Sequence, residues 1–424
     1  LCVWAARAAP RTVGELFVVD AYGLLFTALL CAAALGALVL AREYFRRGAE
    51  DPFGEFATLL VLGTLGAATL SLSRHFFSFF LGLELLSVSL YGLIAYPRGR
   101  VSAGEAGLKY LILHAAAAAF LLFGLALAYG ESGAMEFERM GAAPGNLWSR
   151  AGAAMALLGI AFKLALVPAH GWAPDVYEGA PAPATAFVAT VSKGAVLGFL
   201  VRHFGAFRQA APEGAEWGIG LVAAASMTAG NLLALLQDNV KRLLAYSATA
   251  QAGYVLVAVV AGGSEGVEAA TFFAAAYMAS TLAVFAAVTA LSEPGREAES
   301  LEDYQGLFWR RPWTAALLAG GLLSLAGVPL TAGFVGKVYL MAAGAGAARW
   351  ALLAALGVNS AIGFFVYMRV VAVLYRPAPG PEALPAAGWK TAWAGAAPAA
   401  IVFVLGVWPE PLQRLIRDAA LALR

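Results

Sequence analysis

Long apolar runs recur along the chain from residue 20 to residue 408, many of them near the roughly 20 residues that a helix needs to cross a bilayer. Hydrophobic residues make up 61% of the 424 residues and charged residues 13%, whereas soluble globular proteins average about 45–50% and about 25%. A membrane β-barrel would instead show alternating segments of about ten residues. Backbone polar groups in a bilayer must be satisfied internally, so the runs predict an all-α, polytopic transmembrane helical bundle.

We expect twelve membrane spans in this sequence. They cover residues 20–41, 55–73, 76–96, 106–129, 150–168, 184–206, 217–236, 243–262, 268–291, 313–343, 348–375 and 389–408. The tenth run is unusually long and contains Gly327, Pro329 and Gly333, and the fifth ends at Pro168. Because proline removes a backbone donor and clashes with the preceding turn, both helices are expected to be broken there.

The two expected breaks suggest an internal repeat. Residues 55–206 would form a first five-helix repeat and residues 217–375 a second, with a discontinuous helix as the fourth span of each. An odd number of spans inverts the second repeat, and inverted repeats with broken helices are typical of transporters. With a leading helix at 20–41 and a last span at 389–408 followed by a C-terminal tail to 424, the chain would be a single integral membrane domain, 1–424. Alternatively, the prolines and glycines reflect only the general frequency of these residues in membrane helices.

Lysine is distributed unevenly along the chain. Of the 28 lysines and arginines only six are lysines, and five of these lie within or at the edge of an expected span: Lys109, Lys163, Lys193, Lys241 and Lys337. Arginine does not release its proton in practice, whereas a buried lysine can. A charge facing lipid would cost about 2.5–3.5 kcal/mol, so the deep lysines should face protein or a wet cavity. The pattern predicts proton carriers inside the membrane.

Glu84 is the one acidic residue deep in an expected span, and we predict that it pairs with Lys163. A nearby carboxylate favours the charged form of a lysine, and its withdrawal favours the neutral form. His114 could relay protons or make only an interhelical hydrogen bond. His170 lies seven residues after Lys163, on the same face if helical geometry persists, and could relay protons or cap the broken helix. A structural ion pair is the alternative for any single buried charge.

The sequence contains no recognisable cofactor motif. Its two cysteines, Cys2 and Cys31, cannot ligate an iron–sulfur cluster, and no cluster of His, Cys and Asp has metal-ligand spacing. The segment GIGLVA at 218–223 fits a loose dinucleotide-binding pattern, but it lies in an apolar span without a preceding strand and indicates helix packing. We therefore expect no cofactor in this chain. We also expect no nucleic-acid partner, because no basic stripe lies outside the spans.

Four stretches carry a resemblance to a known family. They are FLGLELLSVSLYGL around Glu84, FKLALVPAHGWAPDVYEGAPAPATAFVATVSKG from Phe162 to Gly194, DNVKRLLAYSATAQAGY from Asp238 to Tyr254, and LSLAGVPLTAGFVGK from Leu323 to Lys337. The second stretch is long and unusual in composition, which makes it the most specific. Over essentially its whole length the chain resembles the antiporter-like membrane subunits of NADH–quinone oxidoreductase, respiratory complex I.

The resemblance implies a fourteen-helix fold with two inverted five-helix repeats, of which the first two helices are expected to be missing from the twelve spans. It implies that Glu84 and Lys163 are the acid–lysine pair of a proton pathway, that Lys193 links this pair to the cytoplasmic side, and that Lys337 lies nearer the exit. Many relatives carry a histidine where this chain has Gln251, which cannot titrate. The predicted primary pathway is Glu84, Lys163, Lys193 and Lys337, and the predicted secondary pathway is Lys109, His114, His170 and Lys241.

The resemblance also implies a setting for the chain. We expect a multi-pass protein of the bacterial plasma (inner) membrane, in contact with the lipid bilayer and with other complex I membrane subunits, especially sister antiporter-like subunits and a small membrane subunit. NADH, FMN, iron–sulfur clusters and quinone would bind to other subunits, whose electron transfer would drive proton translocation here. Two alternatives stay open: a subunit of an Mrp-type sodium/proton antiporter, which shares the fold, and a non-translocating membrane scaffold subunit.

Overall fold

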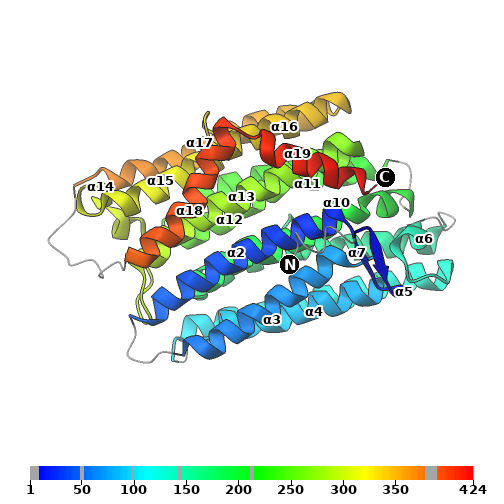
Figure 1. The fold of residues 1–424 in the computed structure, drawn as a ribbon, viewed down its shortest axis with the longest axis horizontal. Helices are drawn as coiled ribbons and strands as arrows, with labels where there is room; N and C mark the ends of the chain where they lie inside the picture. Colours follow the sequence, from blue (N-terminus) through cyan, green and yellow to red (C-terminus); the bar gives the residue numbers. More distant parts are fainter. Residues whose placement is uncertain are drawn as a thin grey trace.

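The computed structural model of the chain describes residues 9–47, 52–97, 99–141, 146–210, 214–377 and 389–423, with the side chains of residues 210 and 389–394 left out. Cys2 lies outside these residues. Most helices run roughly along the long axis of the molecule and form an elongated bundle (Figure 1). A short antiparallel hairpin of β1 (Arg11–Val13) and β2 (Phe17–Val19) precedes them. The sequence did not predict it, because two three-residue strands show no clear periodicity.

The first half of the chain forms the helices on one side of the bundle and part of its centre. They are α2 (Ala21–Phe45), α3 (Phe53–Leu72), α4 (Phe76–Ile94), α5 (Val101–Ser132), α6 (Phe137–Gly141), α7 (Leu147–Leu164), α8 (Trp172–Gly179), α9 (Ala182–Phe187), the π-helix η2 (Val188–Ser192) and α10 (Lys193–Ala210).

The second half completes the bundle on the other side. It contains α11 (Ala215–Leu235), α12 (Val240–Ala261), α13 (Gly263–Leu291), the 3₁₀-helix η3 (Leu301–Tyr304), α14 (Leu307–Arg310), α15 (Pro312–Ala326), α16 (Ala332–Gly346), α17 (Trp350–Leu374), α18 (Trp389–Val407) and α19 (Glu410–Leu421). Helix α2 lies between the two halves and packs on both α3 and α13 (Figure 1).

Polar side chains set the start of several helices. Asp20, Asn239 and Thr331 precede α2, α12 and α16, and a side-chain oxygen of each accepts a hydrogen bond from the backbone N–H three residues further on. These N-caps satisfy donors that have no partner within the helix. Polar residues therefore fix where these apolar helices begin.

Burial separates central from peripheral helices. In the most apolar 18-residue stretch of each helix, the share of buried residues is 94% between Ala182 and Gln209, 89% in α12 and 94% in α13. The corresponding share is 22% in α5 and 28% in α17. The peripheral helices expose large apolar side chains such as Leu35, Val61, Val88, Phe120, Leu221 and Phe365. Such a surface suits lipid, whereas charged side chains that point into the bundle interior are shielded from lipid.

The described residues contain ten helices that are long and apolar enough to cross a membrane, or eleven if the bent pair α18–α19 counts as one span. Each of the twelve expected spans contains helix, but the expected span 313–343 is divided into α15 and α16, of 15 residues each. The residues after the last expected span form the helix α19, bent by 84° from the end of α18. The all-helical, polytopic class is confirmed.

Both expected helix breaks are present, and they have the same backbone geometry. At the end of α7, Ala165 adopts a left-handed conformation with φ of 58°, and at the end of α15 Gly327 does so with φ of 82°. In each case the left-handed residue donates to the carbonyl three residues before it at 2.9 Å, and the next residue donates to the carbonyl five residues before itself at 2.9 or 3.0 Å. This is the Schellman pattern of helix ends. The helix therefore ends at Leu164, earlier than the expected Pro168.

Candidate proton-translocation site

Lys163 lies near the end of α7, beside the first break, and its side chain is buried. Its amine donates hydrogen bonds to Ser87 Oγ on α4 at 2.7 Å and to Tyr110 Oη on α5 at 2.9 Å. The amine also lies over the Tyr110 ring, 5.3 Å from its centroid. Three helices thus hold one amine away from lipid with neutral hydroxyl acceptors.

Glu84 lies on α4, one turn before Ser87, and is half-buried. It interacts electrostatically with Lys163. However, its Oε1 atom is buried and has no hydrogen-bond partner among the described residues. The structure therefore places the predicted acid–lysine pair near one another, with the Ser87 hydroxyl as the direct partner of the amine.

His114 extends this polar group further along α4 and α5. Its Nε2 atom lies 3.2 Å from Ser87 Oγ, and its Nδ1 atom lies 2.6 Å from Tyr91 Oη. A continuous hydrogen-bonded row therefore runs from Lys163 through Ser87 and His114 to Tyr91. Ser87 and Tyr91 were not predicted, because hydroxyl residues in apolar helices give no distinctive sequence signal.

The first break is closed by a tryptophan. Trp172 Nε1 donates to the carbonyl of Phe162, in the last turn of α7, at 2.7 Å. His170 lies half-buried in the break, its ring centroid 6.4 Å from that of Tyr246. Its Nδ1 atom is buried and has no partner within the described ranges. The structure therefore shows the carbonyl-capping role for Trp172 and does not join His170 to Lys163.

Lys193 is the first residue of α10 and directly follows the π-helix η2. Its amine is buried, lies 5.6 Å from the ring centroid of Tyr177, and has no hydrogen-bond partner in the described part of the chain. It borders a cavity of about 30 Å³ that Leu164, Gln251 and Tyr277 also line. One ordered water needs about 10–15 Å³, so the cavity has room for one or two waters beside the amine.

Gln251 and Lys337 meet at the end of α15. Gln251 Nε2 donates to the carbonyl of Leu325 at 3.1 Å, and Lys337 Nζ donates to the carbonyl of Ala326 at 2.8 Å. Lys337 is buried on α16, and its amine lies 5.0 Å from the ring centroid of Tyr254. Two neighbouring carbonyls at the second break thus accept hydrogen bonds, one from Gln251 and one from Lys337.

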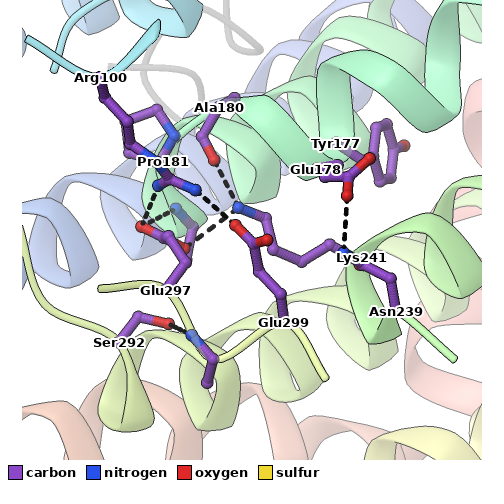
Figure 2. Close-up of polar contacts among 12 residues, drawn as sticks. Arg100, Tyr177, Glu178, Ala180, Pro181, Asn239, Lys241, Ser292, Glu297 and Glu299 are labelled. Atoms are coloured by element: carbon purple, nitrogen blue, oxygen red, sulfur yellow. Dashed lines mark hydrogen bonds and ion pairs between the residues drawn. The ribbon is translucent and has the colours of Figure 1, made fainter. Parts of the chain in front are cut away.

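Lys109 and Lys241 differ sharply from each other. Lys109 is 45% exposed and forms ion pairs with Glu105 and Asp175 at 2.7 and 2.9 Å. Lys241 is fully buried and forms an ion pair with Glu297 at 3.1 Å (Figure 2). The structure places Lys109 outside the buried set. Sequence reasoning missed Glu297, because it lies in the segment after α13, outside any apolar run.

This arrangement suits proton transfer between amines, hydroxyls and an imidazole, and offers no metal chemistry in the described ranges. No group of three or more His, Cys, Asp or Glu side chains there could hold a metal ion. The deep lysines face the protein interior, as the cost of a charge in lipid requires.

Comparison with known proteins agrees with this fold and site. Residues 73–363 match the family described as NADH:quinone oxidoreductase/Mrp antiporter, TM. The chain is 46% identical to NADH-quinone oxidoreductase subunit N of Methylococcus capsulatus over 96% of this chain and 84% of that protein. It is similar to a chain of respiratory complex I from Thermus thermophilus with bound aureothin, with a TM-score of 0.85, 32% identity, and coverage of 99% and 91% of the two chains. It also shares its fold with a chain of the Mrp complex from Dietzia, with a TM-score of 0.86, 23% identity, and coverage of 96% and 84%.

A membrane-spanning bundle with two broken helices and four buried, interior lysines defines an antiporter-like membrane subunit. The match to the family covers more than half of the chain, and the identity to the relative extends over nearly all of it. The chain belongs to the family of subunit N of NADH-quinone oxidoreductase.

Proposed function

We propose that this chain translocates protons across the bacterial plasma membrane as a subunit of NADH-quinone oxidoreductase, driven by electron transfer in other subunits. The observation that carries the proposal is the burial of Lys163, Lys193 and Lys337 in the bundle interior, none of them in an ion pair with a described carboxylate. A buried charge without such a pair is costly. These amines therefore suit proton exchange better than a structural role.

The contacts suggest an order for the pathway. Glu84, Ser87 and His114 surround Lys163 at the first break. The cavity lined by Leu164, the residue after Lys163, leads to Lys193 and Gln251. Gln251 in turn contacts the end of α15, where Lys337 binds. Water in the cavity would carry the proton past Leu164, with Lys193 as the link to the cytoplasmic side and Lys337 nearer the exit.

Gln251 would connect Lys193 to Lys337 without gaining or losing a proton itself. Its amide donates to Tyr367 Oη at 2.9 Å, and Tyr367 Oη lies 2.5 Å from Ser247 Oγ. An amide fixed in this way cannot release a proton. Its role is to order the groups between Lys193 and Lys337, so that hydroxyls and water transfer the proton.

The helix packing supports two inverted five-helix repeats. Helices α3 and α4 form one of the closest pairs in the first half, and α11 and α12 do so in the second. Likewise α5 packs on α7 before the first break, and α13 packs on α15 before the second. We propose that α15 and α16 form one discontinuous span of a fourteen-helix family fold.

The partners follow from the same proposal. The chain would lie beside sister antiporter-like subunits and a small membrane subunit, and NADH, FMN, iron–sulfur clusters and quinone would bind elsewhere in the assembly. Transport energy would reach this chain through contacts with those subunits.

Reconstitution of the whole complex tests the proposal. We expect purified complex in liposomes to move protons when it oxidises NADH with quinone, equally well with and without sodium ions. Measurement of lumenal pH in both buffers decides this point. Proton movement that requires sodium would indicate an Mrp-type antiporter. A scaffold role would follow if assembled complex with Glu84→Gln and Lys163→Met pumped like the unmodified complex.

Ser87→Ala tests the hydrogen-bonded row around Lys163. The change removes one acceptor of the Lys163 amine and the link to His114. Hydrogen bonds to charged groups contribute about 1.5–3 kcal/mol, so we expect the rate of proton pumping to fall by about tenfold or more. Ser89→Ala is the matched control, because Ser89 Oγ on the same helix donates to the carbonyl of Leu85 at 2.8 Å and, among the described residues, does not contact Lys163 or His114. Equal pumping by the two variants would contradict the row.

A further inference from the structure

The ion pair between Lys241 and Glu297 is the most deeply buried one among the described residues, with both side chains fully inaccessible. Neither residue touches the row around Lys163. The Lys241 amine makes a second contact, with the carbonyl of Ala180 at 2.6 Å, and Glu297 Oε1 accepts from the backbone N–H of Ala182 at 3.4 Å. Figure 2 shows the pair beside this backbone segment. The pair thus satisfies two backbone groups that the gap between α8 and α9 leaves free.

Further residues keep Glu297 in this place. Tyr44 Oη donates to its Oε1 atom at 2.6 Å, and an Arg100 nitrogen lies 3.7 Å from the same atom. Arg100 also forms an ion pair with Glu299. These contacts join α2, the start of α5 and the segment after α13 around one carboxylate. A carboxylate surrounded by two cations and a hydroxyl donor is held in one position.

The start of α12 holds α8 at additional points. Asn239 Nδ2 donates to Glu178 Oε1 at 3.0 Å, and Arg242 Nη1 donates to Glu178 and Asp175 at 2.7 and 2.9 Å. Together with the Lys241 contact, the first residues of α12 fix the last turn of α8.

The same turn of α8 faces Lys193. Tyr177, three residues before Ala180, presents its ring to the Lys193 amine at 5.6 Å. The Tyr177 carbonyl accepts from Thr185 Oγ1 of α9 at 3.3 Å, and α9 runs directly into the π-helix that precedes Lys193. The end of α8 therefore lies between two lysines: Lys241 holds its backbone, and Lys193 contacts its aromatic side chain.

We infer that Glu297 and Lys241 are positioning residues for Lys193: their ion pair fixes the segment from Ala180 to Ala182 and with it the Tyr177 ring and the helix that carries the Lys193 amine. The inference rests on the proposed proton pathway and changes the role of Lys241 within it. Lys241 then serves to hold the Ala180 carbonyl and Glu297 in place instead of transferring protons. Glu297 has a positioning role, although it lies outside every apolar run of the sequence.

The variant Lys241→Arg distinguishes a positioning role of residue 241 from a role in proton transfer. Arginine keeps the charge and can donate to both the Ala180 carbonyl and Glu297, but it does not release a proton. In purified, assembled complex in liposomes we expect Lys241→Arg to pump within about twofold of the unmodified complex, and Lys241→Met to lose about tenfold or more, because small misplacements cost rate. Lys163→Arg serves as the comparison for a proton carrier. Arg139→Lys serves as the unchanged control, because Arg139 is exposed and forms a surface ion pair with Glu136 at 3.1 Å.

Amide hydrogen exchange supplies a second readout that does not depend on pumping. Glu297→Gln keeps an acceptor for Ala182 and Tyr44 but leaves Lys241 without a carboxylate. We expect assembled Glu297→Gln complex to show faster exchange at residues 180–193, and equal exchange at α3 and α17.

The outcomes distinguish the inference from the proposed function. Normal pumping by Lys163→Arg would overturn the proposed function, while the exchange result still tests the positioning role. Loss of pumping in Lys241→Arg with normal assembly would make Lys241 a proton carrier and overturn the inference. Unchanged hydrogen exchange in Glu297→Gln would also overturn the inference. This measurement therefore tests the positioning role even if the variants at position 241 do not assemble.

Discussion

Replacing Lys163 with arginine is expected to lower proton pumping by the assembled complex by at least about tenfold, because a guanidinium keeps its proton under all working conditions. The arginine would retain a positive charge near Glu84 and could still donate to Ser87 and Tyr110. Assembly should therefore suffer less than transport. NADH oxidation should become slow or lose its coupling to proton movement.

The rate of proton movement in liposomes, with complex matched for assembly, measures this effect, and the ratio of protons moved to NADH oxidised shows whether coupling is lost. Lys109→Arg is the matched control. Lys109 lies at the exposed end of α5 in ion pairs with Glu105 and Asp175, which either cation can form. Exposed ion pairs contribute about 0–1 kcal/mol, so this control should pump like the unmodified complex. Normal pumping by Lys163→Arg would overturn the proposed function.

Gly333→Ala is expected to prevent formation of the second helix break and to reduce the amount of assembled complex strongly. A Cβ atom at this position would lie 1.9 Å from the carbonyl oxygen of Ser324 and 3.0 Å from its Oγ atom. The backbone N–H of Gly333 donates to the same Oγ at 3.1 Å, so α16 packs directly on the end of α15. The clash is with backbone and cannot be relieved by a side-chain rotation, so we expect a cost of about 3 kcal/mol or more.

The yield of complex on native gels and its thermal unfolding temperature measure this effect. Gly357→Ala in α17 is the control, because a Cβ atom there meets nothing within 4 Å. In a helix interior alanine is favoured over glycine by about 0.8–1 kcal/mol, so this control should assemble at least as well as the unmodified complex. A Gly333→Ala complex with normal yield and stability would show that α16 does not pack directly on the end of α15.

The helix positions could be predicted from the sequence because burial in a bilayer leaves long apolar runs. The breaks were predictable from Pro168 and from the glycines around Pro329. The exact end of α7 was not predictable, because Ala165 adopts a left-handed conformation and an alanine in a sequence gives no indication of it. The short hairpin before α2 and the helix α19 after α18 lie outside the apolar runs and depend on tertiary contacts.

The deep lysines were predictable because lysine is rare in this chain and costly in a membrane. The hydrogen-bond and ion-pair partners of these lysines were not predictable. Ser87 looks like any small polar residue of a membrane helix, and Glu297 looks like any charged residue of a loop. Lys109 and Lys241 both lie near the start of a helix, yet one is exposed and the other fully buried, because only α12 lies at the centre of the bundle.

The π-helix before α10 has a consequence for the direction of the Lys193 side chain. A π turn contains about one residue more than an α turn, and one residue corresponds to about 100° of rotation about the helix axis. An uninterrupted α-helix from Ala182 onward would therefore aim Lys193 roughly a quarter turn away from the Tyr177 ring and the cavity. The π-helix therefore sets the direction in which the Lys193 amine points, towards the Tyr177 ring and the cavity. An insertion or deletion of one residue in Val188–Ser192 should turn the amine away from both.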